Sequence, residues 1–458
     1  MSSRKLLVLT GVVVALFAFI FFFERKMPTT AERQQKGDLH WDLPEDRVER
    51  IRLERGSETI ELAKSGDAWK LVQPEPYPAD SFAAGDLASE LADLKNPGGG
   101  PAAEGKAGDY GLVDPVAKAT ITWTDPKEPA RRVSRTIAFG IDIPGTDVTA
   151  AQVAGAPGIL FVPASVAASV RKPADELKSK DVFGPSALDV ARIDVSRGRG
   201  SLVLAKKNGV WWLEQPVSDL ADREVVERLA GDLSSLRVTE FVPRSQAADL
   251  AALGLAPPAF RVTMTDAKGS KHVLDLGSTL SDGNSLYASR EAQVFTVPNA
   301  IVEELSREAV SFRDRSLVRF ERSDVTGVES RIGAGRRSFV RNQAGWSVDG
   351  RPLIASAADD LLTALADVQS VAFLDESQAK ALALRPPESE ITVRLAKGPA
   401  WRIALYPLRA EFLTTVSGRP GAFTVSREAA GRLAAAIDKA AAAPAAAAPT
   451  RPAATPSP

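Results

Sequence analysis

Apolar and polar residues alternate along several short segments, and such alternation predicts strands with one buried face. Residues 48–53 alternate in this way, and residues 59–62 resume the pattern after a Gly-Ser turn. A Trp-bearing segment follows at 68–73 and ends at Pro74, which stops a strand because proline has no N–H to donate. Residues 82–94 then carry their apolar side chains at helical spacing, behind an aspartate suited to cap a helix.

This order of elements recurs along the chain, which predicts a repeat protein. An offset of 142 residues takes three landmarks of the first repeat, Val48, Trp69 and Leu91, to Val190, Trp211 and Leu233. Between the second and third repeats the offset falls from 135 at Trp346 to 128 at Phe423, because loops tolerate changes of length. A Gly-Leu connector that precedes a proline also recurs, at residues 111–115 and 254–257.

These offsets predict the boundaries of the chain's parts. We assign residues 1–26 to a cytoplasmic tip with a transmembrane anchor and residues 27–45 to a tether. The three repeats are expected at 46–180, 181–318 and 319–440, and a disordered Ala/Pro-rich tail at 441–458. Each repeat is expected to contain three strands, a helix, a connector, three or four more strands and a closing helix. Segregated antiparallel strands with few helices favour the α+β class. We therefore expect an N-terminal transmembrane helix followed by three tandem, mainly antiparallel α+β repeats.

Residues 6–23 form an uninterrupted apolar run. As a helix, this run would span about 27 Å, close to the hydrocarbon core of roughly 30 Å. The charged residues 24–26 stop it, and residues 21–24 lack the small side chains of a signal-peptide cleavage site. We expect an uncleaved, single-pass anchor in a bacterial inner (cytoplasmic) membrane, with the bulk of the chain in the periplasm. A buried core helix is the alternative, and basic residues on both sides of the run leave its orientation nearly balanced.

The composition excludes several classes of chemistry. Of 458 residues, 57 are Lys or Arg and 58 are Asp or Glu, so no overall field favours nucleic acid. The chain has no cysteine, which excludes disulfides, thiolate metal sites and cysteine nucleophiles. Two histidines, His40 and His272, leave little for metal or Ser-His chemistry. We predict no catalytic, cofactor-binding or metal-binding residue and no enzyme activity.

The tryptophans are the first candidates for contact with a partner. Trp69, Trp211 and Trp346 lie within predicted strands, which favours a place in the core over a stacking surface for sugars or peptides. Trp212 directly follows Trp211, so its side chain is expected on the opposite face of the strand. We therefore take Trp212 as a possible partner contact.

A group of arginines in the third repeat supplies the other candidates. Arg331, Arg336, Arg337 and Arg341 form a basic cluster, and of these Arg336, Arg337 and Arg341 are taken as possible partner contacts. A solvated face is the plain alternative, and contact with anionic lipid is another. The glycines at 333 and 335 resemble part of a phosphate-binding loop, but they align with the hairpin turn of the first repeat and lead into no helix.

The opening hairpin, the Gly-x-x-Trp strand, the capped helix and the Gly-Leu-x-x-Pro connector together resemble a bacterial domain-of-unknown-function family, numbered 4340. The resemblance covers nearly all of residues 45–440 as three diverged copies. It implies a membrane-anchored envelope protein encoded beside ABC transporter components of the gliding-motility type. The family offers no catalytic residues to carry over. The third repeat departs from the pattern, with Arg351-Pro352 displaced and Val368 in place of a leucine.

From the residues and the resemblance, we expect a non-catalytic, membrane-anchored extracytoplasmic auxiliary or scaffold protein of an ABC-type transport system. Its expected partners are the membrane, through residues 6–23, and a transporter membrane subunit or companion auxiliary protein. No nucleic acid and no small-molecule cofactor are expected. A cell-envelope glycan-binding protein and a glycan-acting enzyme are the alternatives.

Overall fold

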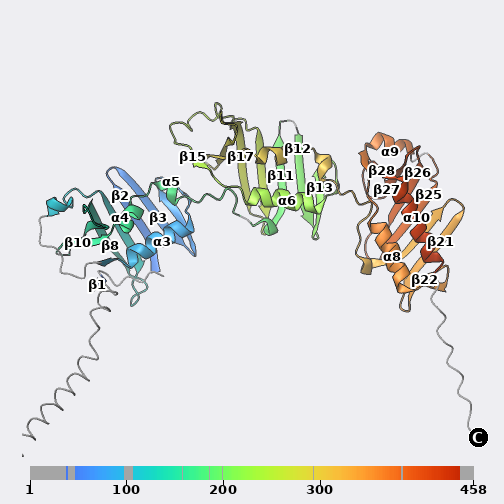
Figure 1. Cartoon of the computed structure of the whole chain (residues 1–458), viewed down its shortest axis with the longest axis horizontal. Helices are drawn as coiled ribbons and strands as arrows, with labels where there is room; N and C mark the ends of the chain where they lie inside the picture. The colour runs from blue at the N-terminus through green and yellow to red at the C-terminus, as the bar shows by residue number, and fades with distance from the viewer. Residues whose placement is uncertain are drawn as a thin grey trace, which may run out of the picture. The chain divides into compact units, whose positions relative to one another are not determined.

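Three large antiparallel sheets follow one another along the chain in the computed structural model (Figure 1). The structure describes residues 38–39, 47–96 and 107–443, apart from 157, 185, 199, 292, 383 and 384. The chain divides into two compact units, Met1–Lys180 and Asp181–Pro458. The first compact unit contains one large sheet, and the second contains two.

The first sheet has eight strands in the order β10-β9-β8-β7-β2-β3-β4-β5. Its strands are β2 (Val48–Arg55), β3 (Glu58–Ser65), β4 (Ala68–Gln73), β5 (Tyr77–Pro78), β7 (Ala117–Thr124), β8 (Arg132–Asp142), β9 (Val148–Val153) and β10 (Leu160–Pro163). Helices α3 (Ser81–Ala92) and α4 (Ala164–Val170) cover one face, and α5 (Ala174–Leu177) contacts α3. A separate pair joins β1 (Asp38–Leu39) to β6 (Lys95–Asn96).

The second sheet has nine strands in the order β14-β13-β12-β11-β16-β17-β18-β19-β15. Its strands are β11 (Val190–Arg197), β12 (Gly200–Lys207), β13 (Val210–Gln215), β14 (Asp219–Leu220), β15 (Glu240–Phe241), β16 (Phe260–Asp266), β17 (Lys271–Thr279), β18 (Ser285–Arg290) and β19 (Gln293–Pro298). The helices of this second repeat are α6 (Arg223–Ser234) and α7 (Ile301–Ser306).

The third sheet has the same plan, in the order β23-β22-β21-β20-β25-β26-β27-β28-β24. Its strands are β20 (Val325–Ile332), β21 (Gly335–Asn342), β22 (Gly345–Val348), β23 (Arg351–Pro352), β24 (Ala372–Leu374), β25 (Ser389–Leu395), β26 (Trp401–Pro407), β27 (Glu411–Val416) and β28 (Ala422–Ser426). Its helices are α8 (Ala355–Ala366), α9 (Glu376–Leu382) and α10 (Arg427–Ala441).

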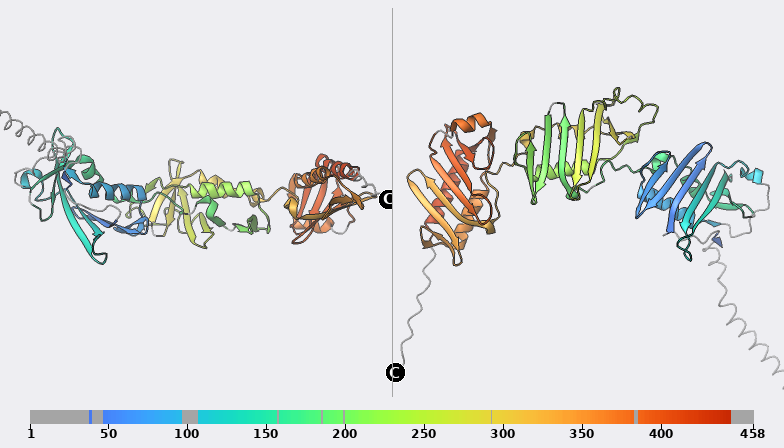
Figure 2. Two further views of the ribbon diagram at one scale, coloured as in Figure 1. Left: turned by 90° about the horizontal axis from the view of Figure 1, so that it is seen from below. Right: turned by 180° about the vertical axis from the view of Figure 1, so that it is seen from behind.

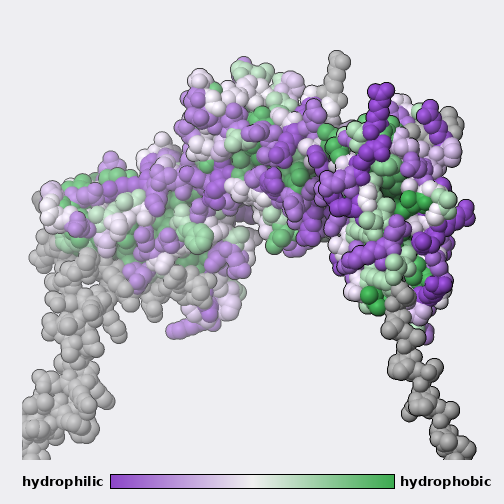
Figure 3. Space-filling view, turned by 45° about the vertical axis from the view of Figure 1, so that its right-hand side comes forward, coloured by the Kyte–Doolittle hydropathy of each residue, from purple (hydrophilic) through white to green (hydrophobic). Residues whose placement is uncertain are grey.

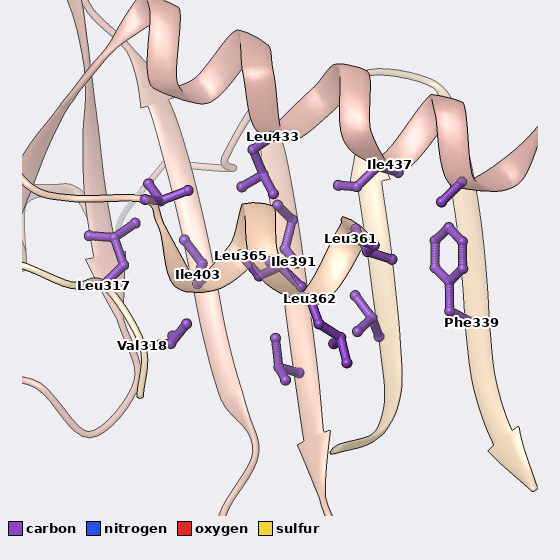
Figure 4. Packing of buried hydrophobic residues seen from close by; sticks show 14 of the residues in the cluster. Leu317, Val318, Phe339, Leu361, Leu362, Leu365, Ile391, Ile403, Leu433 and Ile437 are labelled. Carbon is purple, nitrogen blue, oxygen red and sulfur yellow. The ribbon is translucent and has the colours of Figure 1, made fainter. Parts of the chain in front are cut away.

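The core of each sheet lies between the strands and the helices on one face. In the third sheet, Leu361 and Leu365 of α8 and Leu433 of α10 pack on Ile391 and Ile403 of the central strands (Figure 4). The alternation of apolar and polar residues produces this arrangement, because successive side chains of a strand point to opposite faces. The helices begin where the sequence indicates: the Asp80 and Asp222 side chains each accept two backbone N–H groups at the starts of α3 and α6.

The Gly-Leu connector packs against a glycine of the sheet. A Cβ atom at Gly140 would lie 2.0 Å from the carbonyl oxygen of Tyr110, and one at Gly277 would lie 2.3 Å from that of Leu253. Any side chain at these two positions would therefore displace the connector. By strand register, Leu405 of the third sheet corresponds to Leu276 of the second, so Tyr406 occupies the position of Gly277. The connector of the third sheet contains the helix α9. This difference accounts for the diverged third connector.

The predicted fold class, α+β with a transmembrane helix, is wrong. The three mainly antiparallel repeats are present, but short segments for which no strand was predicted add edge strands such as β5, β14 and β24, so that each sheet reaches eight or nine strands. The described helices contain far fewer residues than the strands.

The predicted placement as a single-pass, periplasmic protein of the inner membrane is also corrected. Within residues 38–39, 47–96 and 107–443, with the gaps given above, no helix is long and apolar enough to cross a membrane. The longest, α10, has 15 residues and would span about 22 Å, short of a hydrocarbon core of roughly 30 Å. The anchor predicted at 6–23, most of the tether and the tail from 444 onward lie outside the described residues.

Candidate functional site

Each sheet packs its longer helices on one face, and we call the opposite face the open face. In the first sheet the connector with the short helix η3 (Ala107–Tyr110) packs on one part of this open face. Figure 2 (right) shows the strands of the second sheet in front of its helices, and Figure 1 shows the helices in front. The open faces carry ion pairs between neighbouring strands, such as Arg50 with Glu61 in the first sheet and Arg394 with Glu329 in the third. The ion pairs make a polar partner better suited to these faces than an apolar one. On the side of the molecule seen in Figure 3, where the open face of the second sheet is turned away, hydrophobic residues lie in small groups among hydrophilic ones.

A hollow of about 490 Å³ lies on the open face of the third sheet. It is lined by Glu329, Ser330, Arg331, Arg336, Arg337, Ser338, Asp349, Glu390, Thr392 and Arg402, from β20, β21, β25 and β26 and the turn after β22. Thus four arginines and three carboxylates from five segments of the chain meet at one place.

Two arginines stand directly opposite each other in this hollow. Arg331 of β20 pairs in register with Arg336 of β21, so both side chains project from the same face of the sheet. Arg331 has a counter-ion in Glu390 at 3.5 Å and donates to the Pro387 carbonyl at 3.3 Å. Arg336 is exposed, and within the described part of the chain its guanidinium has no ion-pair partner.

The arginine pair is particular to the third sheet. At the same register the second sheet places Ser196 opposite Ser201, and the first sheet places Glu54 opposite Thr59. The repeated backbone therefore presents different chemistry at one position. A requirement of the fold would apply equally to the three sheets, so the shared fold does not require the arginine pair.

The structure separates the three predicted arginines. Arg336 and Arg337 both line the hollow, where Arg337 reaches Asp349 at 3.7 Å. Arg341 lies apart from it and donates to the carbonyl oxygens of Arg322 and Ser323, at 3.2 and 3.0 Å. Arg341 thus has a local structural role, because it binds the short helix η6 (Arg322–Asp324), which precedes β20.

Trp211 and Trp212 point to opposite faces of β13, as their adjacency predicts. Trp211 is 2% exposed in the core, whereas Trp212 is half-buried on the open face between Ala205 and Leu220. The Lys207 ammonium lies 5.8 Å from the centre of the Trp212 ring. Trp69 is also buried, and Trp346 is half-buried against the core, so the core interpretation of the repeated tryptophans is confirmed.

Ion pairs fix the open face around Trp212. Glu214 accepts from Lys207 at 2.7 Å and from Arg192 at 2.6 Å. These hydrogen bonds, that of Lys207 first, hold the pKa of Glu214 below its ordinary value. The Trp212 surface is therefore a preformed, charged surface with one aromatic ring. The same register position holds Lys70 in the first sheet and Ser347 in the third.

A larger hollow, of about 790 Å³, lies on the open face of the first sheet, and sequence reasoning missed it. Glu49 sits in it and accepts from Arg132 at 2.7 Å and from the Thr124 hydroxyl. The Thr124 hydrogen bond, followed by that of Arg132, lowers the pKa of Glu49. These residues are up to 83 positions apart, and the alternation in β2 was the available signal, because it places Glu49 off the core.

Metal binding finds no support in the described residues: among them, no group of three or more His, Asp or Glu side chains is placed to hold an ion. His272 lies on β17, opposite Met264 of β16. The arrangement of the open faces can bind charged groups by ion pairs and hydrogen bonds.

Tandem antiparallel sheets with open polar faces define a repeat protein, and comparison with known proteins places it in a family. The model of the family described as Domain of unknown function (DUF4340) matches residues 69–220 and 211–387. The chain therefore belongs to this family. Both matches begin at the repeated tryptophan, Trp69 in β4 and Trp211 in β13, so the family comparison and the repeat agree.

Other comparisons add little. None of the curated proteins matches the chain. Solved structures with some similarity include DNA polymerase III subunit beta sliding clamps from Pseudomonas aeruginosa, at 9% identity, 87% of this chain, 96% of that chain and a TM-score of 0.15. Those from Bartonella birtlesii (9%, 83%, 91%, 0.15) and Caulobacter crescentus (10%, 86%, 95%, 0.15) are alike. Such low TM-scores carry no conclusion about fold or function.

Proposed function

We propose that this chain is a non-catalytic scaffold that binds another protein through the open faces of its sheets. The opposed pair of Arg331 and Arg336 in the hollow of the third sheet is the observation that carries the proposal. The family resemblance suggests the partner, a component of an ABC-type transport system.

Repulsion within the arginine pair favours an acidic partner. Like charges directly opposite each other destabilise a sheet, and Glu390 offsets the charge of Arg331 but leaves Arg336 without a counter-ion among the described residues. A carboxylate from outside would bind Arg336 through two parallel N–H donors, the geometry that guanidinium groups favour. We therefore expect the partner to present an acidic peptide segment.

The size of the hollow supports a peptide segment as the bound group. Its volume of about 490 Å³ lies within the roughly 300–1,000 Å³ typical of sites for small ligands. A few side chains of a partner would fill it, and the other polar residues of the open face would surround them.

The glycan-binding alternative depends on Trp212, a half-buried aromatic residue on the open face of the second sheet. Sugars stack on the face of such a ring, but Lys207 already lies over it and is held there by Glu214 at 2.7 Å. A stacked sugar would have to displace this lysine. The acidic-partner proposal requires no such rearrangement.

Photo-crosslinking in the producing cells tests the proposal. A photoreactive residue replaces Thr392, which lines the hollow, in the full chain, and the adducts are identified by mass spectrometry. We expect an adduct with a component of an ABC-type transport system. The change Arg336→Glu should lower its yield about tenfold or more, because a hydrogen bond to a charged group contributes about 1.5–3 kcal/mol.

The matched control is Arg432→Glu, the same charge reversal on α10, on the helix-covered face of the same sheet. It should leave the yield unchanged. Equal yields for the Arg336→Glu chain and the parent chain would refute the role of the arginine pair. Adducts with cell-wall enzymes and none with a transport component would refute the partner and favour the glycan alternatives.

A further inference from the structure

A buried cluster of charged residues joins the second sheet to the third. Asp219 of β14 is 1% exposed, and it forms ion pairs with Arg313 and Arg419. Arg313 directly follows the short helix η5 (Ala309–Phe312), whereas Arg419 lies in the turn between β27 and β28 of the third sheet. The two arginines are 8% and 7% exposed. Charged side chains are rarely buried to this extent unless they are paired.

The carboxylate of Asp219 is fully engaged by these partners. Its Oδ1 accepts from Nε of Arg419 at 2.8 Å, and its Oδ2 accepts from Nη2 of Arg419 at 3.0 Å. Oδ2 also accepts from Nε of Arg313 at 2.7 Å. The Arg419 contact is thus bidentate, the strongest geometry for a guanidinium and a carboxylate. It links residues 200 positions apart.

Backbone carbonyls accept further hydrogen bonds from the two arginines. Arg313 donates through Nη2 to the Pro420 carbonyl of the third sheet at 3.0 Å. Arg419 donates through Nη2 to the Asp314 carbonyl at 2.7 Å and through Nη1 to that of Ser316. No buried side-chain nitrogen or oxygen of Asp219, Arg313 or Arg419 lacks a partner in the described chain. The segment between the sheets is therefore held from both sides.

Two aromatic rings of the third sheet cover the cluster. The Arg313 guanidinium lies 4.1 Å from the ring centre of Phe373, in β24, and the Arg419 guanidinium lies 4.6 Å from that of Phe423, in β28. The rings meet edge to face, with their centres 5.6 Å apart. They exclude water, and electrostatic attraction is stronger where water is excluded.

One part of this cluster recurs in the second repeat, and another part does not recur in the first. Arg290 of β18 donates to the carbonyl oxygens of Asp181 and Val182, at 3.2 and 2.5 Å, just as Arg419 donates to those of Ser316 and Leu317. An arginine that holds the incoming chain is thus shared by the second and third repeats. The carboxylate is not shared, because the landmark offset of 142 residues places Tyr77 at the position of Asp219.

We infer that the Asp219–Arg313–Arg419 cluster is a built-in lock that makes the second and third sheets one rigid body. Its consequence for binding is direct, because a partner that contacts both sheets then meets surfaces at a fixed spacing and loses less conformational freedom on binding. The lock does not depend on the identity of any partner. Its test can therefore fail or succeed independently of the test of the proposed scaffold function.

The distance between spin labels on the two sheets tests this inference in the full chain. The chain contains no cysteine, so Arg228→Cys in α6 and Asp359→Cys in α8, both exposed positions, give two unique labels. Pulsed electron resonance should give one narrow distance distribution. The change Arg419→Met should abolish the narrow peak, while Asp219 keeps Arg313 as its counter-ion and the second sheet stays intact.

The matched control is Asp275→Asn, which removes an Asp–Arg pair with Arg261 on the open face of the second sheet. It should leave the distribution narrow. Circular dichroism establishes that each variant is folded. If Arg419→Met does not fold, Arg419→Lys, which keeps the charge but loses the bidentate contact, replaces it and should broaden the peak. A broad distribution in the parent chain, or an unchanged narrow one in the folded lock variant, would overturn the inference.

Discussion

Replacing Trp211 by alanine perturbs the repeated strand where its side chain is most deeply buried. The indole is 2% exposed on β13, and the strand packs beside α6, whose buried face carries Val226, Leu229 and Leu233. The next residue, Trp212, has the same chemistry on the opposite, open face. The two tryptophans therefore form a matched pair in which burial is the main difference.

The expected loss follows from the buried area. A buried tryptophan removes about 150–250 Å² from water, which corresponds to roughly 4–6 kcal/mol at about 25 cal/mol per Å². The unfolded chain already buries part of this area, and mutation of buried Trp to Ala in cores costs about 3–5 kcal/mol. The indole N–H of Trp211 has no acceptor among the described residues, and such a buried donor costs about 1–3 kcal/mol. We therefore expect a loss near 3 kcal/mol.

The unpaired indole N–H yields a second expectation. Trp211→Phe keeps most of the apolar bulk and removes the donor, so its loss should be well below that of Trp211→Ala. Trp212→Ala should cost clearly less than Trp211→Ala, because the Trp212 side chain is only partly buried.

Urea unfolding of the full chain, followed by circular dichroism, measures these losses. Hydrogen exchange on peptides from β11 to β13 assigns the transition to the second sheet, since a protein of several sheets need not unfold in one step. Equal losses at Trp211 and Trp212, or a loss below about 1 kcal/mol for Trp211→Ala, would refute the orientation of β13 and return Trp211 to the candidates for a binding surface.

Two further predictions concern the first and second sheets. Hydrogen bonds from Arg171 lower the pKa of Asp142 to about 2, so Asp142→Asn should cost less than about 1 kcal/mol for this largely exposed pair. That loss should be present above pH 4 and disappear as the pH falls toward 2, and a loss independent of pH in urea unfolding would contradict the assignment. Gly277→Ala should cost about 1–3 kcal/mol because its Cβ meets the connector at Leu253. Gly231→Ala, in the open space of α6, should stabilise by up to about 1 kcal/mol, and equal effects of the two glycine changes would contradict the close packing.

The local chemistry of the chain determined the repeated elements. Alternation in segments such as 48–53 predicts strands, and the structure has β2 there. Asp80 and Asp222 cap helices as their sequence position indicates, and the repeated Trp69 and Trp211 are in the core. These features depend on neighbours within a few positions, so the sequence carries them directly. The anchor predicted at 6–23 stays outside the described residues, and the fold class built on it was wrong.

Tertiary structure alone decided which distant residues meet. The alternation of β20 and β21 predicts faces, but the strand register determines that Arg331 stands opposite Arg336. The three mainly antiparallel repeats were predicted, but the number of edge strands depended on pairing, and it made each sheet larger than an α+β arrangement requires. The physical reason is that strand propensity is local, whereas register and neighbour choice depend on contacts between residues far apart in the chain. Asp219 and Arg419, 200 positions apart, show this most clearly, because neither has a sequence signal that names the other.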